Sequence, residues 1–383
     1  MKLKDIVTFV SKSVVPQRGA KYNLYSLPSF DENKSAEVLD GAEIQSNKYD
    51  VPNKCILFNK LNVRFKRVWR INNSDSNKIA STEFLPLVVN EDVVDYQYCY
   101  YLLISDEITN YLCGQNSNTS GSHKRIDPQN FLNIDIHLPK MPIQKAIGKT
   151  LSNIDRKIEL NKRINDNLEA MAKQLYDYWF VQFDFPNEEG KPYKSSGGAM
   201  VWNEKLKREI PKEWMASNYT DLFTIGNGQT MPQNEGLVPA YGGNGIVKMV
   251  EISNYPACII IGRVGANCGS IHYSKVPCWV SDNAISICSK NDDWQPFLFY
   301  SLKLYNLSKN KGGSSQPLIT HEALKHLYFP MSEKHINQFC HIVNELQDLI
   351  YSNQQEILKF TKQRDELLPL LMNGQATINY HLS

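Results

Sequence analysis

The sequence predicts an α+β protein in which two mixed α/β domains are separated by two long helices that form an antiparallel coiled coil. One observation behind this prediction is that two stretches of roughly 40 residues show helical heptads, each after a region of short strand-like runs. Another is an internal repeat, because an offset of 192 carries Ile147 onto Phe339 and an offset of 216 carries Tyr25 onto Tyr241. A repeat of this length concerns the whole fold, and it indicates a pseudo-two-fold molecule. The expected segments are residues 1–140, 141–182, 183–216, 217–331 and 332–374.

The composition is that of an ordinary globular protein. The chain has 383 residues, of which 42% are hydrophobic and 21% charged, and a net charge of +2, so it has room for about two or three domains with cores of their own. No apolar run reaches the roughly 18 residues that a membrane span needs, and the N-terminus lacks the features of a signal peptide. We therefore expect a cytoplasmic protein without a membrane partner, whose thiols are reduced.

Four cysteines raise the question of a metal site because they lie ten residues apart, at Cys258, Cys268, Cys278 and Cys288. Zinc sites normally contain close pairs such as CxxC, and none occurs here. Inward-facing positions on successive short strands produce the same spacing. We therefore expect no metal site in this chain.

The first domain and first helix are expected from local patterns. Residues 1 to about 138 contain strand-like runs at 55–58 and 63–69. Pro142 fits the first turn of a helix that continues to about residue 180. Its apolar seam has two asparagine interruptions. The seam positions are Ile147, Leu151, Ile154, Ile158, Asn161, Asn165, Leu168, Ala172, Leu175 and Trp179.

The second half repeats this order after a connector, residues 183–216, that is rich in Pro, Gly and Ser. Residues 217 to about 330 resemble a second β-rich domain. Ser332 can cap a second helix, and Pro369 and Gly374 mark its end. The seam of this helix is also interrupted by polar residues. Its positions are Phe339, Val343, Leu346, Ile350, Asn353, Ile357, Phe360, Arg364, Leu367 and Leu371.

The two helices could each pack on their own domain, but their matched length and polar interruptions favour pairing with each other. The second domain leaves the end of one helix and returns to the start of the other, so the helices should be antiparallel. Asn161 and Asn353 lie near the helix midpoints, and we expect them to form a hydrogen bond. A helix of about 40 residues spans about 60 Å, which suits a spacer between two DNA half-sites roughly one helical turn or more apart.

No catalytic residues are expected. The sequence has no GxxxxGK[ST] phosphate loop. The glycine cluster at 262–269 has the pattern GxxGxxxG, differs from the dinucleotide fingerprint and is followed by another strand-like segment, so a hairpin is the better interpretation. The four histidines near the second helix do not have HExxH spacing.

Local basic clusters are the better functional signal. Between Lys54 and Arg70 there are six cations and no acid, and on a strand Arg64, Lys66 and Arg70 would share one face suited to phosphates, although a solvated strand face would look the same. Polar loops at 114–125 and 309–316 recur at corresponding places in both halves, and their residue types suit contacts to bases and phosphates. The candidate DNA-contacting residues are Lys60, Arg64, Lys66, Arg67, Arg70, Asn118, Ser122, His123, Lys124 and Arg125 in the first half, and Tyr241, Asn244, Arg263, Asn267, Lys309, Lys311, Ser314 and Gln316 in the second.

Residues 175–214, the segment IIGRVGANCGSIHY at 260–273 and the tripeptide at 316–318 resemble the specificity (S) subunits of type I restriction-modification enzymes. The resemblance extends over essentially the whole chain. It implies a non-catalytic subunit whose two target-recognition domains each read one half of a bipartite, asymmetric site in double-stranded DNA. It also implies that the helices set the gap and dock two methyltransferase subunits, with restriction subunits added in the full complex. S-adenosylmethionine, ATP and Mg²⁺ would then belong to the partner subunits, and this chain would hold no cofactor.

The halves are not identical. The interval from Asp5 to Ile147 exceeds that from Asp221 to Phe339 by 24 residues, so the two half-sites should differ. The alternative function is a coiled-coil scaffold whose two β-rich domains bind other proteins or ligands. An enzyme with a site at 262–269 has less support. Salt dependence separates DNA binding from the scaffold hypothesis, because affinity from phosphate contacts falls steeply with salt.

Overall fold

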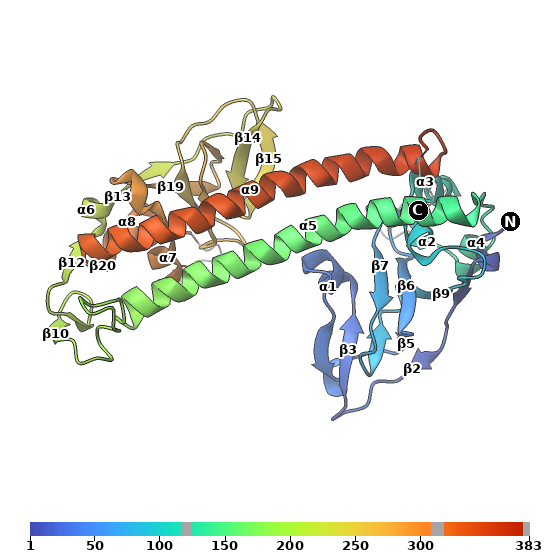
Figure 1. The fold of residues 1–383 in the computed structure, drawn as a ribbon, viewed down its shortest axis with the longest axis horizontal. Coiled ribbons are helices and arrows are strands. Elements are labelled where there is room, and N and C mark those ends of the chain that lie inside the picture. Colours follow the sequence, from blue (N-terminus) through green and yellow to red (C-terminus); the bar gives the residue numbers. More distant parts are fainter. Residues whose placement is uncertain (116–124, 306, 308–317, 378–383) are drawn as a thin grey trace. The chain divides into compact units, whose positions relative to one another are not determined.

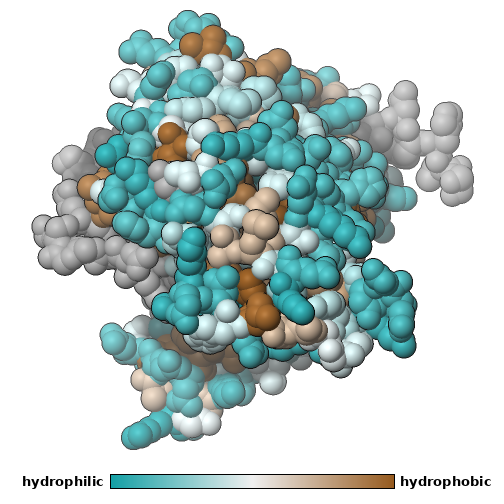
Figure 2. All heavy atoms as spheres, turned by 90° about the vertical axis from the view of Figure 1, so that its left-hand side faces the viewer, coloured by the Kyte–Doolittle hydropathy of each residue, from teal (hydrophilic) through white to brown (hydrophobic). Residues whose placement is uncertain are grey.

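The computed structural model describes residues 1–115, 125–305, 307 and 318–377, and it divides into two compact units (Figure 1). One unit contains Met1–Glu159 and Ile357–Ser383, and the other contains Leu160–Glu356. Each unit therefore has one β-rich domain and a portion of both long helices. Over the described residues, no helix combines the length and apolar character that crossing a membrane requires. On the face seen in Figure 2, hydrophilic side chains predominate and hydrophobic ones form small groups among them.

In the residues that the structure describes, the domain of the first unit is built on two sheets and four short helices. One sheet has the antiparallel order β1-β9-β6-β7 and the other has the order β2-β5-β8-β3-β4. The predicted strand at residues 55–58 is confirmed: it is the central strand β6, and its apolar run is explained by burial on both faces. The elements are β1 (Val7–Phe9), β2 (Ser13–Val14), β3 (Lys21–Tyr25), α1 (Leu27–Glu32), β4 (Glu37–Asp40), β5 (Lys48–Asp50), β6 (Lys54–Asn59), β7 (Val68–Asn72), β8 (Lys78–Ala80), β9 (Phe84–Val89), α2 (Tyr96–Leu103), α3 (Asp106–Gln115) and α4 (Pro128–Leu132), with 3-10 turns at Leu3–Asp5, Gly41–Glu43 and Val63–Phe65.

The domain of the second unit repeats this plan. Its main sheet has the antiparallel order β13-β19-β16-β17, and a second sheet has the order β15-β14-β18. Two further strand pairs, β10–β11 and β12–β20, complete the unit. The elements are β10 (Met200–Asn203), β11 (Arg208–Pro211), β12 (Met215–Asn218), α6 (Tyr219–Leu222), β13 (Phe223–Asn227), β14 (Val238–Gly242), β15 (Gly245–Val250), β16 (Cys258–Gly262), β17 (Ile271–Ser274), β18 (Trp279–Val280), β19 (Ala284–Ser289), α7 (Gln295–Leu304), α8 (His321–Lys325) and β20 (Tyr328–Met331), with a 3-10 turn at Asp292–Trp294.

Strand register aligns the two domains residue by residue. Ile56 pairs with Leu87 in the first sheet, and Ile259 pairs with Ile287 in the second. The offset between equivalent residues is 216 through β1 and β3, falls to 203 through β6 and β7, and is 200 at β9. The largest fall, of 13 residues, lies between β3 and β6, where the first domain contains α1 and the second has a tight β14–β15 hairpin. Most of the expected 24-residue difference is therefore located there.

The two long helices, α5 (Met141–Tyr176) and α9 (Glu333–Met372), pair in antiparallel fashion within each unit (Figure 1). In the first unit, the Lys157 ammonium lies 5.0 Å from the centre of the Phe360 ring. In the second unit, Asn353 Nδ2 donates to Asn165 Oδ1 over 2.9 Å. A five-residue π-helical turn, Asp177–Val181, follows α5 directly.

The predicted seam positions are buried or half-buried. The buried ones are Ile147, Leu151, Ile154, Ile158, Asn161, Phe339, Val343 and Ile350, and the half-buried ones are Leu168, Leu175, Leu346, Asn353, Phe360 and Leu367.

The predicted hydrogen bond between Asn161 and Asn353 is wrong by one helical turn. Asn353 donates to Asn165, and Asn161 Nδ2 donates to Glu356 Oε2 over 2.9 Å. The sequence repeat equates Asn161 with Asn353, but equivalent residues face each other only where the symmetry axis crosses the helices. Here the partner of Asn353 is the other interruption of the α5 seam.

The predicted strand at residues 63–69 is also wrong. Val63–Phe65 forms a 3-10 turn, Lys66 has a left-handed backbone with φ of 48°, and β7 begins at Val68. Burial of Val63 holds this turn against the core. Arg64, Lys66 and Arg70 therefore do not share one strand face.

Candidate nucleic-acid interface

The first domain presents a short segment between β6 and β7, residues 60–67, which we call connector 1. Its ends are closed by a hydrogen bond from the backbone N–H of Asn59 to the carbonyl of Arg67 over 3.0 Å. Asn62 and Lys66 adopt left-handed backbones with φ of 51° and 48°. Arg64 is exposed, and the neighbouring Phe65 is 53% exposed although it is aromatic.

The second domain has the same segment between β16 and β17, residues 263–270, which we call connector 2. The backbone N–H of Gly262 donates to the carbonyl of Ser270 over 2.9 Å. Gly265 and Gly269 have φ of 74° and 90°, at the positions equivalent to Asn62 and Lys66, which explains the glycine spacing because left-handed backbone favours glycine. The hairpin interpretation of the cluster at 262–269 is confirmed.

Both connectors meet the chain that follows a predicted polar loop. In the first domain Leu61 forms an isolated antiparallel β-bridge with Arg125, and the N–H of Ile126 donates to the carbonyl of Lys60 over 2.9 Å. In the second domain Val264 bridges to Leu318, and the N–H of Ile319 donates to the carbonyl of Arg263 over 3.0 Å. Segments that are far apart in sequence thus meet at the corresponding place in both domains. The candidates Asn118, Ser122, His123, Lys124, Lys309, Lys311, Ser314 and Gln316 lie outside the described residues.

A third segment supports each connector from the side. In the second domain the Ser270 hydroxyl donates to the Gly243 carbonyl, and a Cβ on Gly243 would lie 3.5 Å from the Cα of Gly262. This contact places the hairpin tip, with the exposed Asn244, against connector 2. In the first domain Asp31 of α1 accepts hydrogen bonds from Arg67 Nε at 2.6 Å and Nη2 at 2.7 Å. The inserted helix α1 therefore takes the place of the hairpin tip.

Ion pairing separates the predicted cations into two groups. Lys66, Arg67, Arg70 and Arg125 are paired with Asp106, Asp31, Asp155 and Glu83, respectively. Within the described part of the chain, the side chains of Lys60, Arg64 and Arg263 have no hydrogen-bond or ion-pair partner. The Arg64 guanidinium instead lies 4.8 Å from the centre of the Phe65 ring, and that of Arg67 lies 4.7 Å from the same ring. The predicted cations without a partner among the described residues therefore lie on the two connectors, where Arg64 is exposed and Lys60 and Arg263 are half-buried.

Two predicted residues are engaged in contacts within the protein, Tyr241 in the core and Arg70 in a half-buried polar network. Tyr241 is 8% exposed and packs with Cys258 and Ile260. Burial raises the pKa of its hydroxyl, against the opposing effect of a hydrogen bond with Ser274. Tyr241 is equivalent to Tyr25, which is also buried, so the matching tyrosines reflect a shared core.

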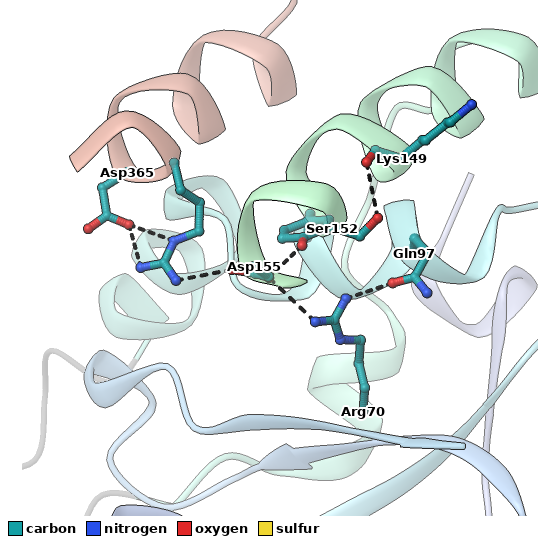
Figure 3. A network of polar contacts seen from close by, with 8 residues as sticks. Arg70, Gln97, Lys149, Ser152, Asp155 and Asp365 are labelled. Atoms are coloured by element: carbon teal, nitrogen blue, oxygen red, sulfur yellow. Dashed lines mark hydrogen bonds and ion pairs between the residues drawn. The ribbon is translucent and has the colours of Figure 1, made fainter. Parts of the chain in front are cut away.

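The half-buried Arg70 takes part in a polar network around Asp155 (Figure 3). Its guanidinium donates to Gln97 at 2.6 Å, approaches Asp155 at 3.4 Å and stacks on Tyr100 at 4.2 Å. Tyr101 donates its hydroxyl proton to Asp155 over 2.5 Å. Burial, followed by the charge of Asp155, raises the pKa of Tyr101, so its hydroxyl remains a donor.

The same carboxylate also accepts from Arg364 of α9 over 3.2 Å, and Arg364 is held in turn by Asp365. Asp155 therefore connects α5 to the sheet, to α2 and to α9. Asp155 could not be predicted from the seam pattern because it lies beside the seam. The arginine at position 364, an anomaly in the seam of the second helix, was the available signal that an acidic partner exists.

The described residues contain no group of three or more His, Cys, Asp and Glu side chains that could hold a metal ion. Cys258 and Cys278 lie in the core with their sulfur atoms 3.6 Å apart. Cys268 is buried within connector 2 and its thiol donates to the Arg263 carbonyl over 3.2 Å. These contacts assign packing roles to the cysteines.

Comparisons with known proteins show the family and the fold of the chain. The model of the family described as "Type I restriction modification DNA specificity domain" matches residues 1–170 and 211–377. The chain is 24% identical over 331 residues to the MjaIX specificity subunit of Methanocaldococcus jannaschii, covering 79% of this chain and 74% of that protein. It is 30% identical over 147 residues to the HindI specificity subunit of Haemophilus influenzae, covering 36% and 32%. The crystal structure of a type I restriction-modification S subunit from M. genitalium has the same fold, with a TM-score of 0.61 at 17% identity, covering 100% of this chain and 96% of that one.

Proposed function

The chain belongs to the type I restriction modification DNA specificity family, and from this premise we propose that each of its domains reads one half of a bipartite, asymmetric target in duplex DNA. One observation carries this proposal at the level of residues. Connectors 1 and 2 share the backbone hydrogen bonds that close their ends and the same left-handed positions, and both carry cationic side chains that have no partner among the described residues. Free cations and polar side chains on an exposed edge are the groups that phosphate and base contacts require.

We propose that the helix pair sets the length of the gap between the two half-sites. Polar pairs in a coiled-coil seam fix register, and the Asn165–Asn353 pair and the Asp155–Arg364 pair occupy two levels of α5 and α9. A fixed register gives a fixed gap between half-sites. In this proposal the helices also dock two methyltransferase subunits, and restriction subunits in the full complex. S-adenosylmethionine, ATP and Mg²⁺ belong to those partners, and the assembly acts on DNA in the cytoplasm.

Binding measurements with the full chain and its methyltransferase partners test the proposal. The wild-type complex should select a bipartite sequence from a randomised duplex library, with affinity that falls steeply as salt rises. Lys60→Ala and Arg263→Ala should each weaken binding to all sequences and reduce the salt slope by about 1. Lys207→Ala, which removes an exposed cation of residues 183–216, is the matched control.

A complex that selects no sequence, or whose affinity is insensitive to salt, would contradict the proposal and favour the scaffold hypothesis. Salt slopes of the two connector variants equal to that of Lys207→Ala would show that the connectors do not contact phosphates.

A further inference from the structure

Connectors 1 and 2 align with a constant offset of 203, and they differ near their ends, where the N–H of Lys66 donates to Val63 and that of Gly269 donates to Gly262. The N–H of Lys60 donates to the Glu83 carbonyl and the N–H of Arg263 to the Asn283 carbonyl, both over 2.9 Å. Farther along, the N–H of Phe65 donates to Asn62 and that of Cys268 to Gly265, both over 3.1 Å. The same frame therefore presents Lys60 and Arg263 at one position, and Arg64 and Asn267 at another.

The first of these positions is cationic in both domains. Contacts to phosphates orient a protein on DNA and carry no sequence information. Two domains that read different half-sites can therefore share this contact. A shared cation at the base of each connector, at Lys60 and Arg263, has the chemistry of a phosphate contact.

The second position differs in chemistry between the domains. Arg64 and Asn267 are both exposed, and within the described residues neither side chain has a hydrogen-bond or ion-pair partner. A guanidinium has donors only and matches the two acceptors O6 and N7 of guanine, whereas a carboxamide has a donor and an acceptor and matches N7 and N6 of adenine. Arg64 and Asn267 therefore occupy the same position of the two connectors but offer different hydrogen-bonding groups. This difference suits the position to distinguishing the two half-sites.

The surroundings of Arg64 orient it for such a contact. Its guanidinium packs on the Phe65 ring, which Arg67 also contacts, and Arg67 is fixed by Asp31. Stacking of a guanidinium on an aromatic ring restricts a long side chain that would otherwise be mobile. Connector 2 has the buried Cys268, 3% exposed, at the equivalent of Phe65. The shorter Asn267 side chain has fewer torsions to restrict and does not need a platform.

We propose that Arg64 and Asn267 are equivalent specificity-determining residues, Arg64 reading a guanine in one half-site and Asn267 an adenine in the other. This inference rests on the proposed function, because it assumes that the connectors lie against DNA. It goes further by assigning a base to each domain and by predicting that the two assignments can be exchanged.

The test uses the full chain in complex with its methyltransferase partners and a randomised duplex library, from which bound sequences are selected and read. Arg64→Asn should remove a guanine preference of roughly 5- to 150-fold at one position of one half-site, leaving the other half-site unchanged. Asn267→Arg should convert an adenine preference into a guanine preference in the other half-site. Arg18→Asn, which removes another exposed arginine of the first domain, should leave both half-sites unchanged.

The possible results can be told apart. If the wild-type complex selects a motif and Arg64→Asn selects the same motif, the base assignment is wrong while the proposed function stands. If Arg64→Asn weakens binding to every sequence equally, with unchanged thermal unfolding, Arg64 contacts a phosphate and the inference is overturned. If the wild-type complex itself selects no motif, the proposed function fails together with this inference.

Discussion

The Asp155 network predicts a large effect from a single substitution, Asp155→Ala. The Asp155 side chain is only 16% exposed, and its carboxylate accepts hydrogen bonds from Tyr101, Arg70 and Arg364. The side chains of the two arginines are each 28% exposed. Removing it deprives a buried hydroxyl and two half-buried cations of a shared acceptor, and leaves Arg70 with Gln97 and Arg364 with Asp365. Losing one partner of a buried ion pair costs about 3–5 kcal/mol. Because these groups retain some solvent, we expect a loss of about 2–4 kcal/mol in the free energy of unfolding of the first unit.

Thermal unfolding followed by circular dichroism measures this effect. For a unit of this size, 1 kcal/mol lowers Tm by about 2–4 °C, so Tm should fall by roughly 5–15 °C. Asp166→Ala, at an exposed position of the same helix, is the matched control and should change stability by at most about 0.5 kcal/mol. The double variant with Arg364→Ala should lose less than the two single variants together, because the residues share one interaction. Equal Tm values for Asp155→Ala and Asp166→Ala would refute the network's role.

Three further predictions concern the helices and their ends. Burial, followed by the charge of Lys334, lowers the pKa of His335 to about 4 from 6.5, so the stability that depends on neutral His335 is fully present above pH 6.5 and is lost as the pH falls toward 4. Denaturant titration at pH 7 and 5 should therefore show a smaller loss of unfolding free energy on acidification for His335→Gln than for the exposed-site control His341→Gln. Equal losses would contradict this role of His335. Asn353→Leu alone should destabilise the chain by about 1–3 kcal/mol by leaving Asn165 unsatisfied, whereas a leucine at both positions should recover stability; a double variant as unstable as the single one would argue against the pair. Deleting one heptad from α5 and from α9 shortens each helix by about 10 Å, so the gap in the selected motif should change while both half-sites persist. An unchanged gap would show that the helices do not set the gap length.

Local patterns predicted the helices well and the connectors poorly. Heptad periodicity is local, so α5 and α9 could be recognised from spacing alone. The run at 63–69 has the alternation of a strand, but the buried Val63 and the left-handed Lys66 turn it into a 3-10 segment. Lys66 and Gly269 are equivalent positions and both have a left-handed backbone. A glycine indicates such a backbone in the sequence, whereas a lysine does not.

The equivalence of the two connectors was hidden from the sequence by an insertion. Offsets of 216 and 192 can be recognised in the sequence at the ends of the repeat. The offset of 203 follows only from strand register, because the extra residues around α1 shift the numbering of the first domain relative to the second. The partners of the connectors, Arg125 and Leu318, are far away in sequence and reach them through bridges that local pattern cannot predict. The register of Asn165 with Asn353 is a tertiary property for the same reason.

We propose that this chain determines which DNA sequence a type I system modifies. Sequencing of methylated bases across the host genome, with the wild-type chain and after its disruption, tests this most directly. We expect one bipartite, asymmetric motif to be methylated in the wild type and unmethylated after disruption, and Arg64→Asn to alter one half of that motif. A methylation pattern that does not change when the chain is disrupted would contradict the account.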